Sequence, residues 1–387
     1  MLQQLVALRN YLMQIKYKRV WKPIFFQIDP EAIHDQMVAL LHFLGKYALT
    51  RKIAYFCWGY SHSSLEQNIL GINFKNPVGL SAGFDKNATL TDIMPSLGFG
   101  FTEIGSITGE KCEGNPKPRL WRLKKSKSLA VYYGLTNNGC ENISKRLKAK
   151  KFSIPVGINI AKTNCRETVD TILAIADYFK AYQVFMDIGD YLTINISCPN
   201  AFGGQTFTDS AKLDALLQKI MSIPKTKPIF LKISPDLNKK EVDDIINIAS
   251  KFKIDGFICT NLTNNRHNKN IIDQKIPAQG GFSGKVLDNL SDDLIRYVYK
   301  KINLSAKAWL WQNSNQPIII GSGGVFSAED AYRKIKAGAS LVQLITGMIF
   351  EGPQLVSDIN LGLVKLLKAD GYKNISDQDT WCINLPD

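Results

Sequence analysis

Histidine is scarce in this chain of 387 residues, and its cysteines show none of the spacings that bind metals. The sequence contains four histidines and seven cysteines, and no two cysteines are close enough to form a CxxC pair. An odd number of scattered cysteines argues against a disulfide framework, and the missing pairs argue against a common zinc site. We therefore expect a protein of a reducing compartment without a bound metal.

Long hydrophobic runs are also missing. No uninterrupted apolar stretch reaches the roughly 18 residues that a membrane-spanning helix requires. Arg9, Lys16, Lys18 and Arg19 interrupt the apolar amino-terminal stretch, and no cleavage site of small residues follows it. A spanning helix and a signal peptide are therefore not expected.

Acidic residues are outnumbered by basic ones. The chain has 48 Lys or Arg against 34 Asp or Glu, which gives a net charge of +14. This excess favours anionic partners such as a phosphate-bearing cofactor, an acidic substrate or a membrane surface. Zinc-finger spacing and aromatic-rich RNA-binding motifs are absent, so a nucleic-acid partner is not expected.

Residues 1–60 show the periodicity of helices. Leu5, Leu8, Leu12 and Ile15 recur at helical spacing, and a second apolar series begins at Ile33. The first 28 residues contain five Lys or Arg and no acid. Such a basic amphipathic segment either lies on an anionic membrane or packs as a helical cap on the main domain. We expect two units, residues 1–60 and residues 61–387.

Eight short runs rich in Val, Ile, Leu or Phe follow, each ending in a small or polar residue. Helix-compatible segments such as 209–221, 239–253 and 328–337 separate most of them. An alternation of strand and helix that repeats eight times over about 280 residues is typical of an α/β protein with the (β/α)8 architecture, the TIM barrel. A doubly wound open sheet is the alternative, but no GxGxxG motif follows the first strand. The predicted strands are 77–82, 99–105, 155–160, 191–196, 228–233, 256–260, 317–321 and 340–345.

Two insertions interrupt this alternation. Residues 110–138 lie between the second and third strands, and residues 264–284 follow the sixth. Their Pro, Gly and Asn content predicts ordered excursions at the top of the barrel.

Chemistry in such a barrel lies at the carboxyl ends of the strands. These ends hold two lysines and several amides, but neither a histidine nor a pair of carboxylates. That composition argues against metal-dependent hydrolysis and against two-carboxylate glycoside chemistry. The residues are 81–86, Ser106, Asn159, Asn195, Cys198, Asn200, Lys232, Asn261, 321–324, Thr346 and Gly347.

The ends of the last two predicted strands indicate an anion site. Gly323 and Gly324 allow backbone N–H groups to approach a phosphate, and Thr346 lies at the next strand end. Loops after the seventh and eighth strands commonly bind phosphate in TIM barrels. The alternative is that the glycines only serve tight turns.

Two lysines have several interpretations each. Lys232 is a Schiff-base lysine, a fixed cation beside an electron-rich ring, or one partner of an ordinary ion pair in the barrel. Lys86 is placed to hold a substrate carboxylate. A Schiff-base aldolase or phosphate-binding isomerase without flavin follows from the first interpretation of Lys232.

Amides and one cysteine complete the candidate site. Asn159, Asn195, Asn200 and Asn261 suit a planar ring with alternating N–H and C=O groups, although a single Asn is more often a turn or cap residue. Cys198, in "NISCPN", lies at the same strand end without a histidine partner.

These motifs together resemble one known family. "NPVGLSAGFDKNA", "GFGFTEIGSIT", "GNPKPRLWRL", "GINIAKTN", "NISCPN", "LKISPD", "GGFSGK" and "GSGGVFSAEDAYRKIKAGASLVQL" resemble dihydroorotate dehydrogenase in order and spacing over about residues 65–365. The helical front with "FQIDPEAIHD" is similar to the class 2 branch, which is membrane-associated and uses a quinone.

The resemblance implies a TIM barrel that holds FMN and acts in pyrimidine biosynthesis. Dihydroorotate would lose a proton from C5 to a base and a hydride from C6 to the flavin, and a quinone reaching the site through residues 1–60 would be reduced. The chain would be a peripheral protein on the cytoplasmic face of the cell membrane, or on the inner mitochondrial membrane in a eukaryote. Matched by motif, the FMN contacts are Ala82, Gly83, Ser106, Asn159, Asn195, Lys232, Ser283, Gly284, Gly323, Gly324 and Thr346; the substrate contacts are Lys86, Asn195, Asn200 and Asn261; the quinone-channel residues are His34 and Arg119.

The same resemblance gives Cys198 a role as general base, so that no histidine is required. A free thiol titrates near pH 8.5, and nearby lysines and N–H donors are expected to lower that value. Residues 201–208 would form a lid over the substrate.

The sequence departs from the class 2 pattern at several positions. Cys198 stands where class 2 members carry serine, and Ile345 where a tyrosine borders the quinone site. Val131 replaces an asparagine of the substrate loop, while Ala201 and Leu262 each replace a threonine. These changes keep open an alternative, a flavin-barrel paralogue that acts on another dihydropyrimidine or cyclic amide.

Overall fold

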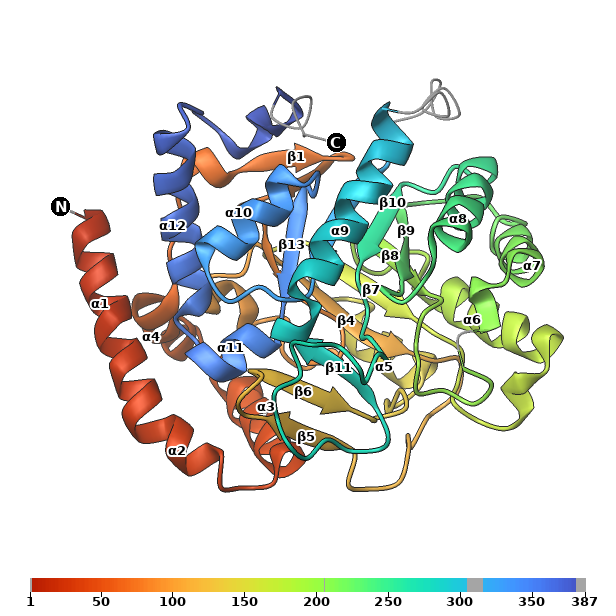
Figure 1. Ribbon diagram of the computed structural model, residues 1–387, viewed down its shortest axis with the longest axis horizontal. Helices are drawn as coiled ribbons and strands as arrows, with labels where there is room; N and C mark the ends of the chain where they lie inside the picture. The colour runs from red at the N-terminus through yellow and green to blue at the C-terminus, as the bar shows by residue number, and fades with distance from the viewer. Residues whose placement is uncertain (1, 205, 305–315, 381–387) are drawn as a thin grey trace.

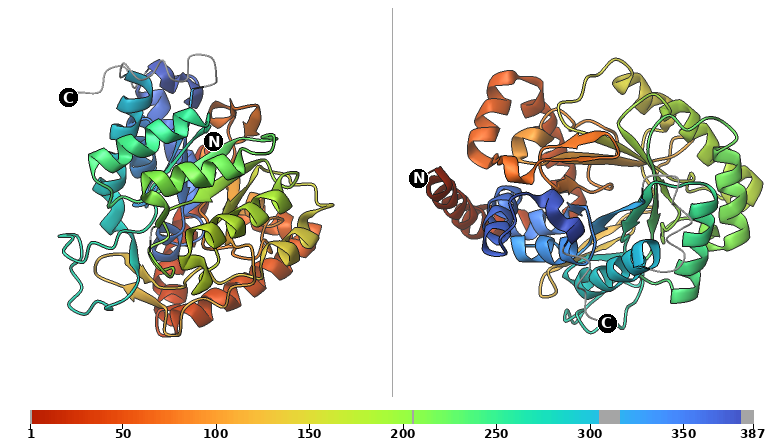
Figure 2. Two further views of the ribbon diagram at one scale, coloured as in Figure 1. Left: turned by 90° about the vertical axis from the view of Figure 1, so that its right-hand side faces the viewer. Right: turned by 90° about the horizontal axis from the view of Figure 1, so that it is seen from above.

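A closed barrel of eight parallel strands forms the centre of the molecule (Figures 1 and 2), in a computed structural model that describes residues 2–204, 206–304 and 316–380. All eight predicted strands are present, which confirms the TIM barrel, and closure of the ring shows that the open-sheet alternative is wrong. In order around the ring, they are β3 (Val78–Leu80), β4 (Phe101–Ile107), β7 (Val156–Ile160), β8 (Tyr191–Asn195), β9 (Ile229–Ile233), β10 (Gly256–Cys259), β12 (Ile318–Ser322) and β13 (Leu341–Leu344).

Helices cover the outside of the barrel (Figure 2, right). The predicted helices 209–221, 239–253 and 328–337 are confirmed to within two residues at each end. Asp209, Asn238 and Ser327 begin these three helices, because each side chain accepts a hydrogen bond from a backbone N–H of the first turn. The outer helices are α5 (Cys140–Leu147), α6 (Thr171–Phe185), α7 (Ser210–Ile220), α8 (Lys239–Lys251), α9 (Asp288–Tyr299), α10 (Ala328–Lys336), α11 (Thr346–Glu351) and α12 (Leu355–Ala369).

The two predicted insertions meet in one small antiparallel sheet. Strands β5 (Leu120–Leu123) and β6 (Ser128–Val131) come from the first insertion, and β11 (Gly281–Gly284) comes from the second. Gly281 pairs with Val131 and Gly284 with Ser128. Figure 1 shows this sheet at one end of the barrel and the hairpin of β1 (Gln67–Ile69) and β2 (Ile72–Phe74) at the other. The barrel is therefore closed by the hairpin at its amino end and covered by the sheet at its carboxyl end.

The amino-terminal helices pack against the barrel. They are α1 (Leu2–Lys16), which continues through a π-helical turn into α2 (Lys22–Phe25), then α3 (Pro30–Lys46) and α4 (Ala48–Trp58). Helix α1 lies along α12 (Figure 1), where Asn10 Nδ2 donates to Ser357 Oγ at 3.0 Å and to Asp358 Oδ1 at 2.8 Å. Among the described residues, no helix combines the length and the apolar character needed to cross a membrane.

The cysteines are scattered over the fold. The six that lie in the described residues are free thiols, and Cys382 lies outside these residues.

Candidate active site

One large cavity lies at the carboxyl end of the barrel, beneath the sheet of β5, β6 and β11. Its volume is about 1270 Å³ with the open mouth included. Strand ends, the covering sheet and α3 all contribute to the wall, so segments distant in the sequence meet around one space. Of the residues proposed as cofactor, substrate, base or quinone contacts, those that line the cavity are His34, Ala82, Gly83, Lys86, Ser106, Asn195, Cys198, Asn200, Lys232, Asn261, Ser283, Gly284, Gly323, Gly324 and Thr346.

A glycine loop after β12 forms one wall. Gly323 and Gly324 have φ values of +109° and +75°, a region that side chains disfavour. A Cβ on Gly324 would lie 2.6 Å from the Cα of Asp288, so any side chain there would displace backbone. Across the loop, the hydroxyls of Ser283 and Thr346 lie 2.8 Å apart. Hydroxyls and bare backbone N–H groups on one wall are suited to a phosphate.

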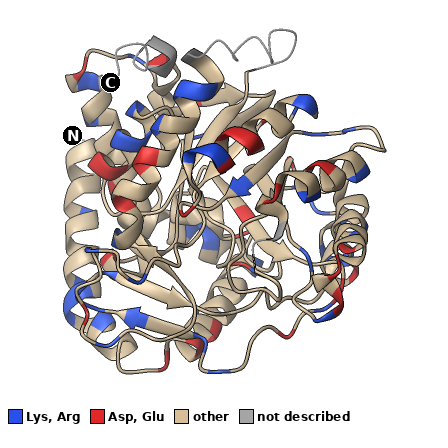
Figure 3. Ribbon diagram, turned by 45° about the vertical axis from the view of Figure 1, so that its right-hand side comes forward, with Lys and Arg blue, Asp and Glu red and all other residues tan. Residues whose placement is uncertain are grey.

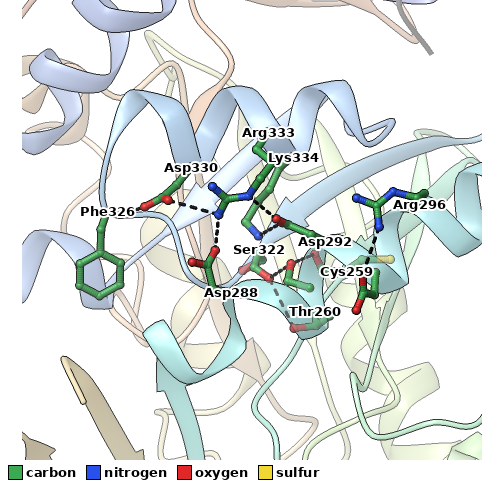
Figure 4. Close-up of polar contacts among 12 residues, drawn as sticks. Cys259, Thr260, Asp288, Asp292, Arg296, Ser322, Phe326, Asp330, Arg333 and Lys334 are labelled. Atoms are coloured by element: carbon green, nitrogen blue, oxygen red, sulfur yellow. Dashed lines mark hydrogen bonds and ion pairs between the residues drawn. The ribbon is translucent and has the colours of Figure 1, made fainter. Parts of the chain in front are cut away.

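A charged cluster behind this loop fixes its position (Figure 4). Asp330 accepts hydrogen bonds from the backbone N–H of Phe326 at 2.9 Å and from Lys285 Nζ at 2.9 Å. Deeper in the cluster, the fully buried Lys334 contacts Asp292 at 2.6 Å. The contact between Asp292 of α9 and Lys334 of α10 joins these two helices, and the contacts of Asp330 hold the end of the glycine loop in place.

The floor of the cavity is a chain of amides and hydroxyls. Asn195 Nδ2 donates to Ser106 Oγ at 3.0 Å, and Asn261 Nδ2 donates to Asn195 Oδ1 at 3.1 Å. Asn159, proposed as a flavin contact, does not line the cavity. Its Nδ2 donates to the buried Glu103 at 2.7 Å, and its Oδ1 accepts from Ser106. Asn159 therefore supports the floor from below.

Lys232 is a buried cation with few hydrogen-bond acceptors and little neighbouring negative charge to stabilise it. Its side chain is 4% exposed, and among the described residues its ammonium has one hydrogen bond, to Ser81 Oγ at a long 3.4 Å. Burial lowers the pKa of Lys232, and Glu103 opposes that effect from farther away. Within the described part of the chain no carboxylate forms an ion pair with Lys232, so the ion-pair interpretation is wrong. An ammonium with free N–H groups at a cavity wall fits a ring that carries acceptors.

Lys86 and His34, which also line the cavity, are in direct contact. Lys86 Nζ lies 2.9 Å from His34 Nε2 and 3.9 Å from the centre of the Tyr133 ring. Burial lowers the pKa of Lys86 to about 8, and burial together with Lys86 lowers that of His34 to about 3. At neutral pH the lysine is therefore mostly charged and donates to a neutral histidine.

Arg119, proposed as a quinone-channel residue, does not line the cavity. Its guanidinium binds Glu31, with Nη2 at 2.7 Å from Oε1, and lies 5.2 Å from the centre of the Tyr133 ring. Arg119 thus anchors α3 and one side of Tyr133.

Cys198 lies at the cavity wall just beyond the end of β8. Desolvation raises the pKa of its thiol to about 11, and the N–H of Asn200, Lys162 and Lys232 oppose this effect without cancelling it. The expectation of a lowered thiol pKa is therefore wrong. Burial outweighs the nearby positive charges, and sequence spacing does not reveal burial.

Three apolar residues line the part of the cavity beside Cys198. They are Val131, Leu135 and Leu262. The carbonyl of Val131 accepts a hydrogen bond from Asn200 Nδ2 at 2.8 Å, which fixes the orientation of that amide. The replacements noted in the sequence at 131 and 262 thus face the space where a substrate would lie.

Gln343 and Tyr133 are among the cavity residues that sequence reasoning missed. Gln343 lies within the apolar run of β13 and donates to the buried Glu103 at 2.9 Å. Tyr133 carries a buried hydroxyl without a hydrogen-bond partner among the described residues. For Gln343, the only signal in the sequence was the alternation of inward and outward side chains along β13. For Tyr133, no local sequence pattern indicated a place in the cavity.

Known proteins match nearly the whole chain. A family profile described as dihydroorotate dehydrogenase matches residues 64–367. A curated relative from Natronomonas pharaonis, described as dihydroorotate dehydrogenase (quinone), is 36% identical over 356 residues and covers 92% of this chain and 96% of its own length. One from Sulfurimonas denitrificans with the same description is 38% identical over 371 residues, with coverages of 94% and 97%.

Solved structures agree with these relatives. Crystal structures of DHODH from Eimeria tenella, one in complex with ferulenol and one ligand-free, both align with a TM-score of 0.79. Their sequences are 30% and 31% identical, covering 90% and 92% of this chain and 94% and 100% of those chains. By profile, sequence and fold, the chain belongs to the dihydroorotate dehydrogenase family, in its quinone-dependent class 2 branch.

Proposed function

We propose that this chain oxidises dihydroorotate to orotate, with FMN as its resident cofactor and a membrane quinone as electron acceptor. The observation that carries the proposal is that a glycine loop, a buried lysine, an amide floor and Cys198 surround one cavity. When bound, FMN would accept the hydride from the substrate and supply electrons to the quinone.

The residues present fit this cofactor. The N–H groups of Gly323 and Gly324, with the hydroxyls of Ser283 and Thr346, would hold a phosphate. Lys232 presents ammonium N–H groups that protein acceptors leave largely unused, as expected beside a ring with carbonyl oxygens and basic nitrogens.

The remaining walls would hold the substrate. Lys86 supplies a cation for its carboxylate, and the amides of Asn200 and Asn261 supply donors and acceptors for the ring. Cys198 would take the C5 proton on its sulfur. The proposed base, Cys198, and the cation, Lys86, thus line the same cavity.

A second candidate substrate class is motivated by Val131 and Leu262, because both line this cavity without a polar side chain. Leaving a ring heteroatom unpaired against them would cost about 1–3 kcal/mol. Another dihydropyrimidine or cyclic amide with fewer polar groups would avoid this cost.

Anaerobic reduction of the bound flavin tests the proposal and separates the two candidates. The visible absorbance of the purified protein should bleach on mixing with dihydroorotate, and much less on mixing with dihydrouracil, which lacks the carboxylate for Lys86. Bleaching by dihydrouracil alone would favour the second substrate class. A purified protein without flavin absorbance would contradict both.

The apolar residues exposed on α1 to α4 support membrane association. On α1, the side chains of Leu5, Leu8 and Leu12 are 59%, 56% and 55% exposed and lie on one face. Basic residues gather where α1 passes into α2, as the blue segments of Figure 3 show. Apolar residues beside lysines and arginines suit the surface of an anionic bilayer.

Replacing these three leucines by glutamine should release the protein from lipid. Loss of apolar contact from Leu5, Leu8 and Leu12 should lower the fraction that sediments with anionic phospholipid vesicles at least about tenfold. The matched control replaces Ile172 and Leu173 by glutamine, since these α6 residues are 77% and 51% exposed on another part of the surface. Equal loss in both variants would contradict a specific role for α1.

A further inference from the structure

A second, much smaller pocket lies on the other side of Cys198. The space that the centre of a water-sized sphere can reach is about 10 Å³ here, against about 200 Å³ in the large cavity, so the small pocket has room for one water molecule at most. Leu135, Asn195 and Cys198 line both this pocket and the large cavity, so the thiol borders both spaces. The residues that line the small pocket alone are Ala161, Lys162, Tyr178, Ile196, Ala201, Gly204 and Phe207.

Lys162 is the cation of this pocket, and the proposed reaction leaves it without a role so far. Its side chain is 3% exposed, and its Nζ donates to two carbonyl oxygens, those of Thr168 at 2.9 Å and Phe202 at 2.6 Å. Across the described residues, no carboxylate lies within ion-pair distance of it. A buried ammonium that lacks a counter-charge is costly, so a group that becomes negative nearby would stabilise it.

Two of the titratable groups near this pair, Asp177 and Tyr178, are already engaged in hydrogen bonds, whereas Lys232 is a second cation that acts on Cys198. Asp177 accepts from the backbone N–H and the hydroxyl of Thr163, both at 2.7 Å. The hydroxyl of Tyr178 donates to the carbonyl of Asn195 at 2.7 Å. Lys232 faces Cys198 from the side of the large cavity.

Two further thiols complete the surroundings. Cys112 faces Cys198 and donates its proton to the carbonyl of Gly134 at 3.3 Å, while Cys165 lies beside Lys162. Cys165 acts on Lys162 more strongly than Cys198 does but does not line the small pocket, whereas Cys198 shares that pocket with Lys162 and also borders the large cavity. The Cys198 sulfur is therefore the group that can carry a negative charge beside Lys162 and also face a substrate.

Lys162 also holds the lid. Its ammonium binds the carbonyl of Phe202, and the side chain of Asn164 accepts a hydrogen bond from the N–H of the same residue at 2.7 Å. Phe202 itself is 52% exposed. Lys162 therefore contacts, at Phe202, the segment that the family resemblance assigns to the lid.

We propose that Lys162 is a positioning residue for the base: its positive charge stabilises the negative charge of the Cys198 thiolate. Because the same ammonium binds the carbonyl of Phe202, this stabilisation is strongest when the lid is closed. The S–H bond of Cys198 breaks, its proton passes to water in the small pocket, and the sulfur keeps the electron pair. The thiolate then takes the substrate proton and becomes a thiol again. The inference rests on the proposed function, in which Cys198 is the base.

Ultraviolet absorbance of the Cys198 thiolate tests this proposal without measuring turnover. The signal is the ultraviolet absorbance of the flavin-bound wild-type protein minus that of the flavin-bound Cys198→Ser variant, recorded as the pH is raised. The Lys162→Gln variant keeps an amide N–H donor for the two carbonyls but removes the positive charge. In this variant we expect the fraction of Cys198 present as thiolate at a fixed alkaline pH to be about tenfold lower than in the wild type, because the pKa of Cys198 should rise by about one unit.

Two further variants make the test decisive. Lys162→Arg keeps the charge and should stay close to the wild-type titration; if it shifts as Lys162→Gln does, packing rather than charge is responsible and the proposal fails. Lys227→Met is the matched control, because Lys227 also donates only to backbone carbonyls, those of Phe185, Ile188 and Gly189. An unchanged titration in a folded Lys162→Gln protein would also overturn the proposal.

Failure of the proposed function would give a different result. If Cys198→Ala reduced its flavin at the wild-type rate, Cys198 would not be the base, yet the titration would still show whether Lys162 sets the charge on its sulfur.

Discussion

Flavin reduction by dihydroorotate should be about 10²–10⁴-fold slower in a Cys198→Ala variant than in the wild type, while FMN stays bound. Alanine removes the group that takes the C5 proton but leaves the glycine loop, Lys232 and the amide floor intact. Anaerobic stopped-flow absorbance measures the rate, and the flavin content of the purified variant checks that the site is assembled.

Cys140→Ala is the matched control for this variant. Burial raises the pKa of the Cys140 thiol to about 11, as it does for Cys198, but Cys140 lies on α5 away from the cavity. A similar loss of rate in both variants would point to a general effect of removing a buried thiol. An unchanged rate in Cys198→Ala would remove Cys198 from the mechanism.

The raised thiol pKa gives the same prediction a pH signature. A base acts in its deprotonated form, so with a pKa of about 11 the active fraction falls as the pH drops below that value. The wild-type rate should therefore rise about tenfold for each pH unit below about pH 8, above which Lys86 loses the charge that would hold the substrate carboxylate. This slope should disappear in Cys198→Ala. A wild-type rate independent of pH from neutral upward would show that ligand binding brings the pKa below neutrality.

The barrel and most of the cavity wall could be predicted because they depend on periodic signals. Alternating apolar runs and helical segments specify parallel strands, and the carboxyl ends of parallel strands necessarily meet at one rim. Residues as distant as Lys86, Cys198 and Gly324 could therefore be assigned to one site before any distance was known.

Other features depend on burial and on side-chain direction, which the sequence does not encode locally. Asn159 lies at a strand end, yet it turns to Glu103 beneath the cavity. Lys162 follows β7 with no motif that marks it, and only the fold places it beside Cys198. The thiol pKa was predicted in the wrong direction because the positive neighbours are visible in the motifs, whereas desolvation appears only after the chain has folded.

Replacing Asp292 by leucine should lower the free energy of unfolding by about 3–5 kcal/mol, the second large effect that we expect. Lys334 is 0% exposed and contacts Asp292 at 2.6 Å, so the variant would leave a buried ammonium without its counter-charge. Burial already holds the pKa of Lys334 below its ordinary value. Urea denaturation followed by tryptophan fluorescence measures the loss.

The double variant Asp292→Leu/Lys334→Met distinguishes charge from packing at this site. It removes both charges, so it should recover most of the stability that the single variant loses, because an apolar pair of similar volume avoids the desolvation cost. Arg333, 42% exposed, also binds Asp292, but water can solvate it after the change. Asp293→Ala is the matched control, since that neighbouring carboxylate is 73% exposed and should change stability by less than about 0.5 kcal/mol. If the double variant were as unstable as Asp292→Leu, the cluster would act through shape, and the glycine loop between α9 and α10 would depend on packing rather than on buried charge.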